Sequence, residues 1–180
     1  MKGFILGILF TIIVSIVGGF WLIKQGRVDM EADQPVSTLE RKIAMTVVDA
    51  SIDRHSPETK NPIQATDENL VVGANIYMNN CAGCHGLPSN PNSQFGHSFY
   101  PTVPQFFKNA PDMPDNQNFY VVRHGIRWTG MPGWGNTLSE QQIWTVVTFL
   151  SHSEKLPPAA LKVLEPSTPS QAPATPPASR

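Results

Sequence analysis

The sequence predicts an all-α fold preceded by a transmembrane helix, and three observations lead to this prediction. An uncharged, strongly apolar stretch runs from Gly3 to Ile23. Further along the chain, apolar residues recur at helical spacing in several separate segments. No pair of segments shows the alternation of apolar and polar residues that two neighbouring strands would require.

The N-terminal stretch, residues 1–23, is predicted to be a membrane anchor. About 20 apolar residues, at a rise of 1.5 Å each, span roughly the 30 Å of a bilayer's hydrocarbon core. A cleaved signal peptide is the alternative, but its apolar region is usually about 7–15 residues long and ends in a small-x-small site. This stretch instead runs through Trp21, a residue typical of the headgroup level, to Lys24. A retained anchor is therefore favoured, and the sequence leaves cleavage open.

Residues 24–66 are predicted to be a polar linker that contains one short amphipathic helix. Leu39, Ile43 and Val47 recur every four residues, which favours a helix over roughly 37–52. This helix could pack on the following domain, act as a spacer or dock on a partner subunit. The interval between the apolar residues does not distinguish packing from docking. We expect the simpler role, in which the helix packs on the domain or acts as a spacer.

Residues 67–156 are predicted to form the main domain. A helix over about 67–80 begins at the capping residues Thr66 and Asp67, and a second short helix runs from 116 to 125. The pattern Ser139-x-x-Gln142 is a capping box, and the apolar residues after it follow helical spacing. Residues 86–115 and 126–136 are predicted to be loops. Residues 157–180 are rich in Pro, Ala, Ser and Thr and are predicted to be a disordered tail.

Composition excludes some classes of partner. The chain has 13 Lys and Arg against 14 Asp and Glu, so no basic surplus indicates a nucleic-acid-binding protein. Between residues 67 and 156 the balance is slightly acidic, which argues against strong electrostatic steering. Both cysteines lie in one motif, so neither is left for a structural disulfide elsewhere.

The motif that carries chemistry is Cys81-Ala82-Gly83-Cys84-His85, the Cys-x-x-Cys-His signature of a covalently attached c-type haem. Two cysteines at this spacing reach the vinyl groups on one edge of a porphyrin, and the adjacent imidazole ligates iron. A thioredoxin-type dithiol would need a βαβ setting, and a zinc site would need a fourth ligand, such as His97 or His124. A disulfide within the motif would close no obvious loop.

Haem iron also needs a sixth ligand for electron transfer, or an open site for ligand chemistry. The candidates after the motif are two methionines and three histidines, namely Met113, Met131, His97, His124 and His152. Both methionines precede a proline, and their local patterns are similar. The residues alone leave this choice open.

Residues 67–152 resemble the bacterial class I monohaem cytochromes c in their membrane-anchored form. The resemblance rests on the motif at 81–86, on the segment Gly125-Ile126-Arg127-Trp128-Thr129-Gly130-Met131-Pro132, and on Gly73 with Tyr77 in the first helix. It implies the class I cytochrome c fold, with three main helices around a covalent haem. It also implies that Gly73 lies where the last helix crosses the first.

The resemblance further implies the site residues. Cys81 and Cys84 would bind haem c, His85 and Met131 would ligate its iron, and the carbonyl of Pro104 would orient His85, with Pro101 as the rival. Arg127 and Trp128 are candidates for binding a haem propionate.

The function implied is electron transfer without a catalytic residue, in a single-pass protein of the bacterial inner membrane with a periplasmic haem domain. Its partners would be redox proteins, and whether it is a free carrier or the haem subunit of a respiratory or dehydrogenase complex stays open. The alternative is a haem enzyme or sensor, such as a peroxidase or gas-binding protein, with an open distal site.

Overall fold

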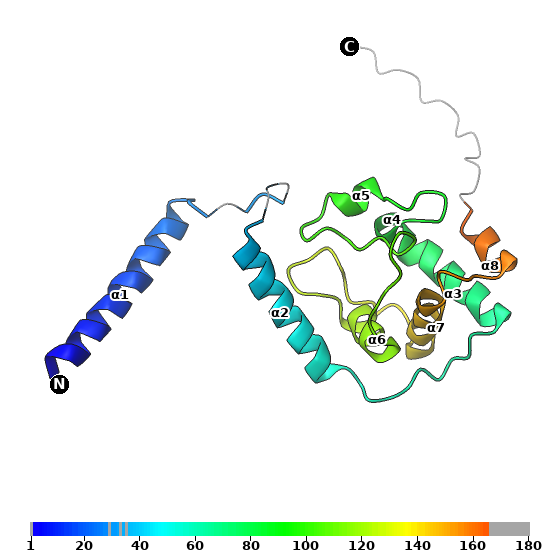
Figure 1. The fold of residues 1–180 in the computed structure, drawn as a ribbon, viewed down its shortest axis with the longest axis horizontal. Coiled ribbons are helices and arrows are strands. Elements are labelled where there is room, and N and C mark those ends of the chain that lie inside the picture. Colours follow the sequence, from blue (N-terminus) through cyan, green and yellow to red (C-terminus); the bar gives the residue numbers. More distant parts are fainter. Residues whose placement is uncertain (1, 29, 33, 35, 166–180) are drawn as a thin grey trace, which may run out of the picture. The chain divides into compact units, whose positions relative to one another are not determined.

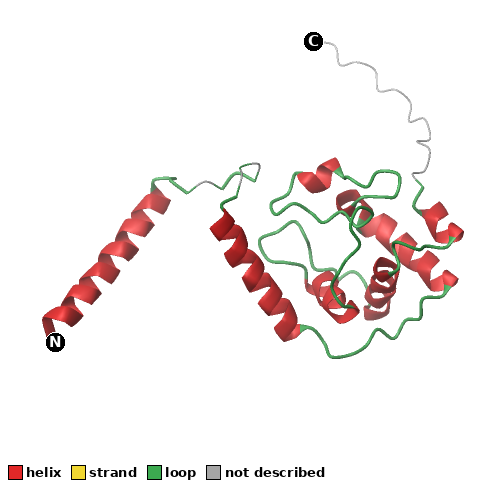
Figure 2. Ribbon diagram, viewed as in Figure 1, coloured by secondary structure: helices red, strands yellow, loops and turns green. Residues whose placement is uncertain are grey.

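The structure, a computed structural model, describes residues 2–28, 30–32, 34 and 36–165 (Figure 1). Its chain divides into two compact units, residues 1–34 and 35–180. Among the described residues there are helices and loops and no strand, apart from one isolated bridge between Leu87 and Asn90 (Figure 2). The prediction of an all-α fold is therefore confirmed.

The first unit contains α1, Lys2–Lys24, whose 23 residues make a helix of about 35 Å at 1.5 Å per residue. Its mean hydropathy reaches 2.5, and the helix is long and apolar enough to cross a membrane. The Thr11 hydroxyl donates a hydrogen bond to the Gly7 carbonyl oxygen of the same helix, at 2.9 Å. Such internal bonding is what a helix surrounded by lipid requires of its polar groups.

The helix α2, Thr38–His55, belongs to the second unit and packs against α6. Ile52 is buried, Gln117 donates to Asp53 at 2.8 Å, and the His55 ring stacks at 6.2 Å on Tyr120. The boundary between the two units therefore falls inside the predicted linker, residues 24–66. Its residues up to 34 belong to the first unit, and those from 35 onward belong to the second. Of the roles left open for this helix, packing on the domain is the one that the structure shows.

The core forms where α3, Asp67–Asn80, crosses α7, Glu140–Ser151. Gly73 permits the crossing, because a Cβ atom at this position would lie 2.5 Å from Phe149 Cβ and 2.8 Å from the Thr145 carbonyl oxygen. Tyr77 and Phe149 are fully buried beside it, with ring centroids 5.2 Å apart. The close contact explains why α3 tolerates a glycine in its interior, where glycine weakens a helix.

Three shorter helices, joined by long loops, complete the part of the domain that contains the motif. They are α4, Ala82–His85, α5, Gln94–His97, and α6, Asp115–His124. As predicted, α6 ends at a glycine: Gly125 has φ +67° and its N–H donates to the Val121 carbonyl at 2.8 Å. The helix α5 lies inside the predicted loop of residues 86–115 and was not expected from the sequence.

The prediction that disorder begins at residue 157 is wrong for the first part of that segment. Residues Pro158–Val163 form α8, which packs against α3 and buries Ala160 and Leu164 almost completely. Proline suits the first turn of a helix, where its missing N–H costs nothing, so a Pro-rich composition concealed a helix start. Residues 166–180 lie outside the described residues.

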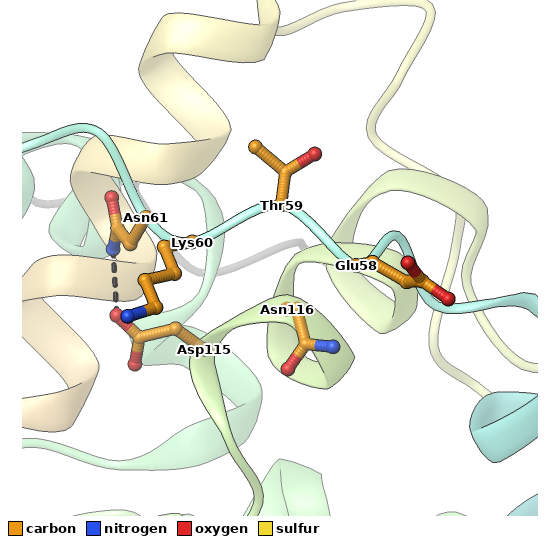
Figure 3. Close-up of a pocket in the computed structure, with 6 residues that line it drawn as sticks. All are labelled: Glu58, Thr59, Lys60, Asn61, Asp115 and Asn116. Atoms are coloured by element: carbon orange, nitrogen blue, oxygen red, sulfur yellow. Dashed lines mark hydrogen bonds between the residues drawn. The ribbon is translucent and has the colours of Figure 1, made fainter.

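A polar pocket of about 350 Å³ lies between the segment 58–61 and the start of α6 (Figure 3). At its edge the Asn61 amide donates to Asp115 at 2.7 Å and to the Thr148 hydroxyl at 2.9 Å. Asn61 therefore ties the segment after α2 to both α6 and α7. None of the pocket-lining residues is a cysteine, a histidine or a methionine, so this pocket is separate from the motif.

Candidate functional site

The Cys-x-x-Cys-His motif lies at the junction of α3 and α4. The backbone turns tightly there, because the N–H groups of Cys84 and His85 both donate to the Cys81 carbonyl, at 3.1 and 2.9 Å. The Tyr77 hydroxyl donates to the Gly86 carbonyl at 2.8 Å, which ties the end of the motif back to α3. The core helix therefore holds both ends of the motif in place.

The imidazole of His85 is held in a defined orientation. Its Nδ1 lies 2.8 Å from the Pro104 carbonyl oxygen, and its ring is stacked on that of Phe106 at 4.3 Å with only 5° between the planes. A carbonyl can only accept, so Nδ1 carries the proton and Nε2 keeps its lone pair. Of the two prolines that the sequence left open, Pro104 is the one that contacts His85.

The protonation state of His85 suits a metal ligand. The side chain is 9% exposed, and burial lowers the pKa of His85 below its usual range, with the Pro104 hydrogen bond acting in the opposite direction. Metal ligation needs the neutral form of imidazole with one free nitrogen. The geometry supplies this form with Nε2 as the free atom.

The buried side chain of Gln105 connects the motif to the loop that follows it. Its amide donates to the carbonyls of Cys84 and Val103, both at 2.9 Å, and its oxygen accepts from the Ser93 N–H at 2.7 Å. Ser93 in turn donates from its hydroxyl to the Gly83 carbonyl. Sequence reasoning missed these two residues, and their only signal was their proximity to Pro104 and to a Ser-rich turn.

The two thiols are suited to covalent attachment. Cys81 and Cys84 are free, half-buried and three residues apart. Burial, with a contribution from the neighbouring Cys84, raises the pKa of Cys81 to about 12, so the thiol is neutral at pH 7. Two thiols on one turn beside a neutral imidazole form the donor set that a c-type haem requires, so the residues present fit this group.

Met131 lies in a loop that is fixed to the end of α6. Its N–H donates to the Thr129 hydroxyl at 3.1 Å, and its carbonyl accepts from the Ile126 N–H at 3.1 Å. Further along, the Trp134 and Gly135 N–H groups donate to the last carbonyls of α6. The side chain of Met131 is half-buried against the hydrophobic core, so the loop presents its sulfur from a defined backbone.

The other candidate ligands have different surroundings. His97 and His124 are exposed, and His124 lies against Tyr120 with ring centroids 4.8 Å apart. His152 is exposed at the end of α7, where its Nδ1 lies 2.8 Å from the Thr148 carbonyl. Met113 precedes α6, and its carbonyl accepts from the Asn118 amide at 2.8 Å.

Arg127 and Trp128 both lie at the surface, four and three residues before Met131, respectively. Trp128 is 92% exposed and has φ +61°. The hydrogen bond from the Thr129 N–H to the Ile126 carbonyl, 3.2 Å long, closes a turn around the two residues. Within the described part of the chain, neither side chain forms a hydrogen bond or an ion pair.

Residues 68–150 match the family model described as cytochrome C oxidase, cbb3-type, subunit III. The match covers α3 to the penultimate residue of α7, and therefore the motif, the Pro104 loop and the Met131 loop. A search of curated proteins finds no match to the chain.

Proposed function

We propose that the protein is a membrane-tethered carrier of single electrons, with a covalently bound haem c whose axial ligands are His85 and Met131, and the match of residues 68–150 to a cytochrome c family model supports this proposal. It would act between respiratory or dehydrogenase partners, either as a free carrier or as the haem subunit of a complex. Cys81 and Cys84 would form the two thioether bonds.

The orientation of His85 is the observation that carries this proposal. The Pro104 carbonyl holds the Nδ1 proton, and the parallel ring of Phe106 restricts rotation of the imidazole. A hydrogen bond at the second nitrogen fixes the tautomer of a metal-bound histidine and raises its basicity. These contacts support His85 as a strong and rigid proximal ligand.

Met131 is proposed as the distal ligand because its loop is rigid and adjoins the core. A bound thioether leaves no open position at iron, which suits electron transfer and not substrate binding, and it raises the reduction potential. The haem supplies the one-electron chemistry when bound, and the chain contributes ligands, geometry and an apolar shell. If both ligands stay bound in the ferric and ferrous states, the geometry at iron is similar in both, and electron transfer requires little reorganisation.

The shell around the site is aromatic and aliphatic. Tyr77 and Phe149 each pack edge to face on Phe107 beside the motif, and Phe106 lies on His85. An apolar shell disfavours the extra positive charge of the ferric state, which also raises the reduction potential. Arg127 and Trp128 remain the candidates for binding a haem propionate.

The helix α1 supports a tether at the membrane, and we propose that the haem domain lies on the periplasmic side of the inner membrane. A tether raises the effective concentration of the domain near partners in the same membrane. This compensates for the weak steering expected of a slightly acidic domain.

The test replaces Met131 with alanine and compares the result with Met113→Ala in the purified full-length chain. Loss of the thioether is expected to abolish the weak far-red ferric band and to lower the reduction potential by roughly tenths of a volt, within the range of about 0.8 V that axial ligands span. Met113→Ala is expected to leave the band and the potential unchanged.

Two results would contradict the proposal. A wild-type ferric spectrum of the high-spin type would indicate an open distal site and would favour the alternative, a haem enzyme or sensor. A far-red band that survives Met131→Ala and disappears in Met113→Ala would assign the distal ligand to the other methionine.

A further inference from the structure

We propose that Gln105 is a positioning residue for His85: its buried side chain holds the Pro104 carbonyl on the imidazole and so sets how strongly this ligand donates to iron. This inference rests on the proposed function, because it takes His85 as a ligand of the haem iron. It starts from the carbonyl groups at the end of the Cys-x-x-Cys-His motif, which bond to segments that lie later in the chain.

The last three carbonyls of the motif accept hydrogen bonds from residues outside it. Helix α4 ends at His85, and the last carbonyls of a helix have no partner inside the helix. The residue four positions after Cys84 is Pro88, which has no N–H to donate. The donors are the Ser93 hydroxyl for Gly83, the Gln105 amide at 2.9 Å for Cys84, and the Phe106 N–H at 3.1 Å for His85. The loop after the motif therefore takes the place of a further helical turn.

The amide group of Gln105 uses both of its hydrogens and its oxygen. Its Nε2 donates to the Cys84 and Val103 carbonyls, both at 2.9 Å, and its Oε1 accepts from the Ser93 N–H at 2.7 Å. A carbonyl can only accept and an N–H can only donate, so these partners determine which end of the amide is the nitrogen. The side chain is 7% exposed, so its removal would leave buried groups without hydrogen bonds.

These hydrogen bonds fix the backbone on both sides of Pro104. The preceding residue, Val103, donates its N–H to the Gly96 carbonyl at 3.2 Å, and its carbonyl accepts from the Gln105 side chain. Proline itself has no N–H with which to hold the segment. The direction of the Pro104 carbonyl, whose oxygen lies 2.8 Å from His85 Nδ1, therefore depends on the side chain of the residue that follows it.

Two glycines leave room for the Gln105 amide. A Cβ atom at Gly96, in α5, would collide with the Cys84 carbonyl oxygen and would lie 2.8 Å from Gln105 Nε2. A Cβ atom at Gly86 would lie 3.1 Å from Gln105 Oε1. Backbone therefore encloses the amide at both ends, and the close approach of α5 keeps the side chain in one orientation.

The position of the Pro104 carbonyl bears on the reduction potential. A hydrogen bond at the second nitrogen raises the basicity of a metal-bound histidine, and a more basic ligand stabilises ferric iron more than ferrous iron. Displacement of the carbonyl would weaken this bond to His85 and would raise the reduction potential. Gln105 acts on the iron ligand through Pro104, so its role is one of positioning.

The experiment compares Gln105→Met with two controls in the purified, haem-loaded full-length chain. Methionine is similar to glutamine in length and shape but has no amide. Gln94→Met makes the same replacement at an exposed position of α5. Ser93→Ala removes the hydroxyl that bonds to Gly83 and keeps the N–H that donates to Gln105. The measured quantities are the Tm, the reduction potential and, by NMR of the reduced chain, the solvent exchange rate of the His85 Nδ1 proton.

Gln105→Met is expected to raise the reduction potential and to accelerate exchange of the His85 Nδ1 proton by roughly tenfold, about the factor that one hydrogen bond contributes. Ser93→Ala is expected to lower the Tm, because it also leaves a buried carbonyl unpaired, but to keep the wild-type potential and exchange rate. Gln94→Met is expected to match wild type in all three quantities. The contrast separates the positioning of His85 from a general contribution to stability.

Three results would overturn the positioning role of Gln105. They are a wild-type potential and exchange rate in Gln105→Met, equal shifts in Ser93→Ala, and a lowered potential in Gln105→Met, which would mean that the side chain serves to exclude water. If Gln105→Met does not load haem, Gln105→Asn, whose amide is one methylene shorter, takes its place with the same shifts expected. A high-spin ferric spectrum of the wild-type chain would instead contradict the proposed function.

Discussion

Gly73 and Gly83 show how strongly the surroundings of a single residue decide its tolerance to change. A Cβ atom added at Gly73 would meet Phe149 Cβ at 2.5 Å and the Thr145 carbonyl at 2.8 Å, whereas one added at Gly83 would have no atom within 4 Å. Both glycines lie in helices, so replacing either one with alanine is expected to stabilise its helix by a similar amount, about 1 kcal/mol. The difference between the two variants therefore isolates the contact between α3 and α7.

Gly73→Ala is expected to lower the free energy of unfolding by about 1–3 kcal/mol, because the contact atoms belong to a backbone carbonyl and a Cβ and cannot move aside. Gly83→Ala is expected to leave stability unchanged or slightly raised. Thermal unfolding of the haem-loaded chain, followed by circular dichroism, compares the two. Equal midpoints for both variants would mean that the helices separate easily at this crossing.

At the scale of secondary structure, the end of the domain is defined by α8 and not by the end of α7. Ala160 and Leu164 are almost completely buried against α3, so α8 closes one side of the core. Removing a buried leucine side chain alone costs about 2–5 kcal/mol. A domain that ended at residue 156 would leave this surface of α3 in water.

We expect a chain truncated after Leu156 to melt several degrees below wild type, and a chain truncated after Glu165 to match wild type. Leu164→Ala should reproduce most of the loss seen on truncation after Leu156, because Leu164, the residue that follows α8, supplies the largest buried side chain of this segment. Differential scanning calorimetry of the three variants and of wild type checks this prediction. A stable chain that ends at residue 156 would show that α8 adds nothing to the core.

At the scale of the whole molecule, the chain consists of an apolar helix and a separate compact unit, residues 1–34 and 35–180. The axial ligands that we propose and both cysteines lie in the second unit. The tethering role that we propose for the first unit rests on the length and hydropathy of α1 alone.

A chain that lacks residues 1–34 is therefore expected to be released from membranes by a carbonate wash, to keep the ferric spectrum of the full-length protein and to keep its reduction potential. The full-length chain is expected to remain in the membrane pellet. Its electron-transfer rate on membranes should fall only weakly with added salt, because tethering replaces long-range steering. A steep fall with salt would show that steering dominates the encounter.

The sequence by itself determined those features that depend on local pattern. The spacing of Cys81, Cys84 and His85, the capping box at Ser139 and Gln142, and the apolar run of α1 all follow from short-range chemistry, which neighbours in the chain specify. The all-α fold and the helices α3, α6 and α7 were confirmed because they depend on such local patterns. The role of Met131 remains a prediction that the Met131→Ala experiment addresses, and the role of Arg127 remains a prediction.

The tertiary structure decided what depends on contacts between distant segments. It selected Pro104 over Pro101 as the partner of His85, placed Gln105 between the motif and the following loop, and packed α2 and α8 on the domain. The reason is that burial of Ile52 and Leu164 depends on the surfaces that α6 and α3 offer, and such surfaces exist only once the chain has folded.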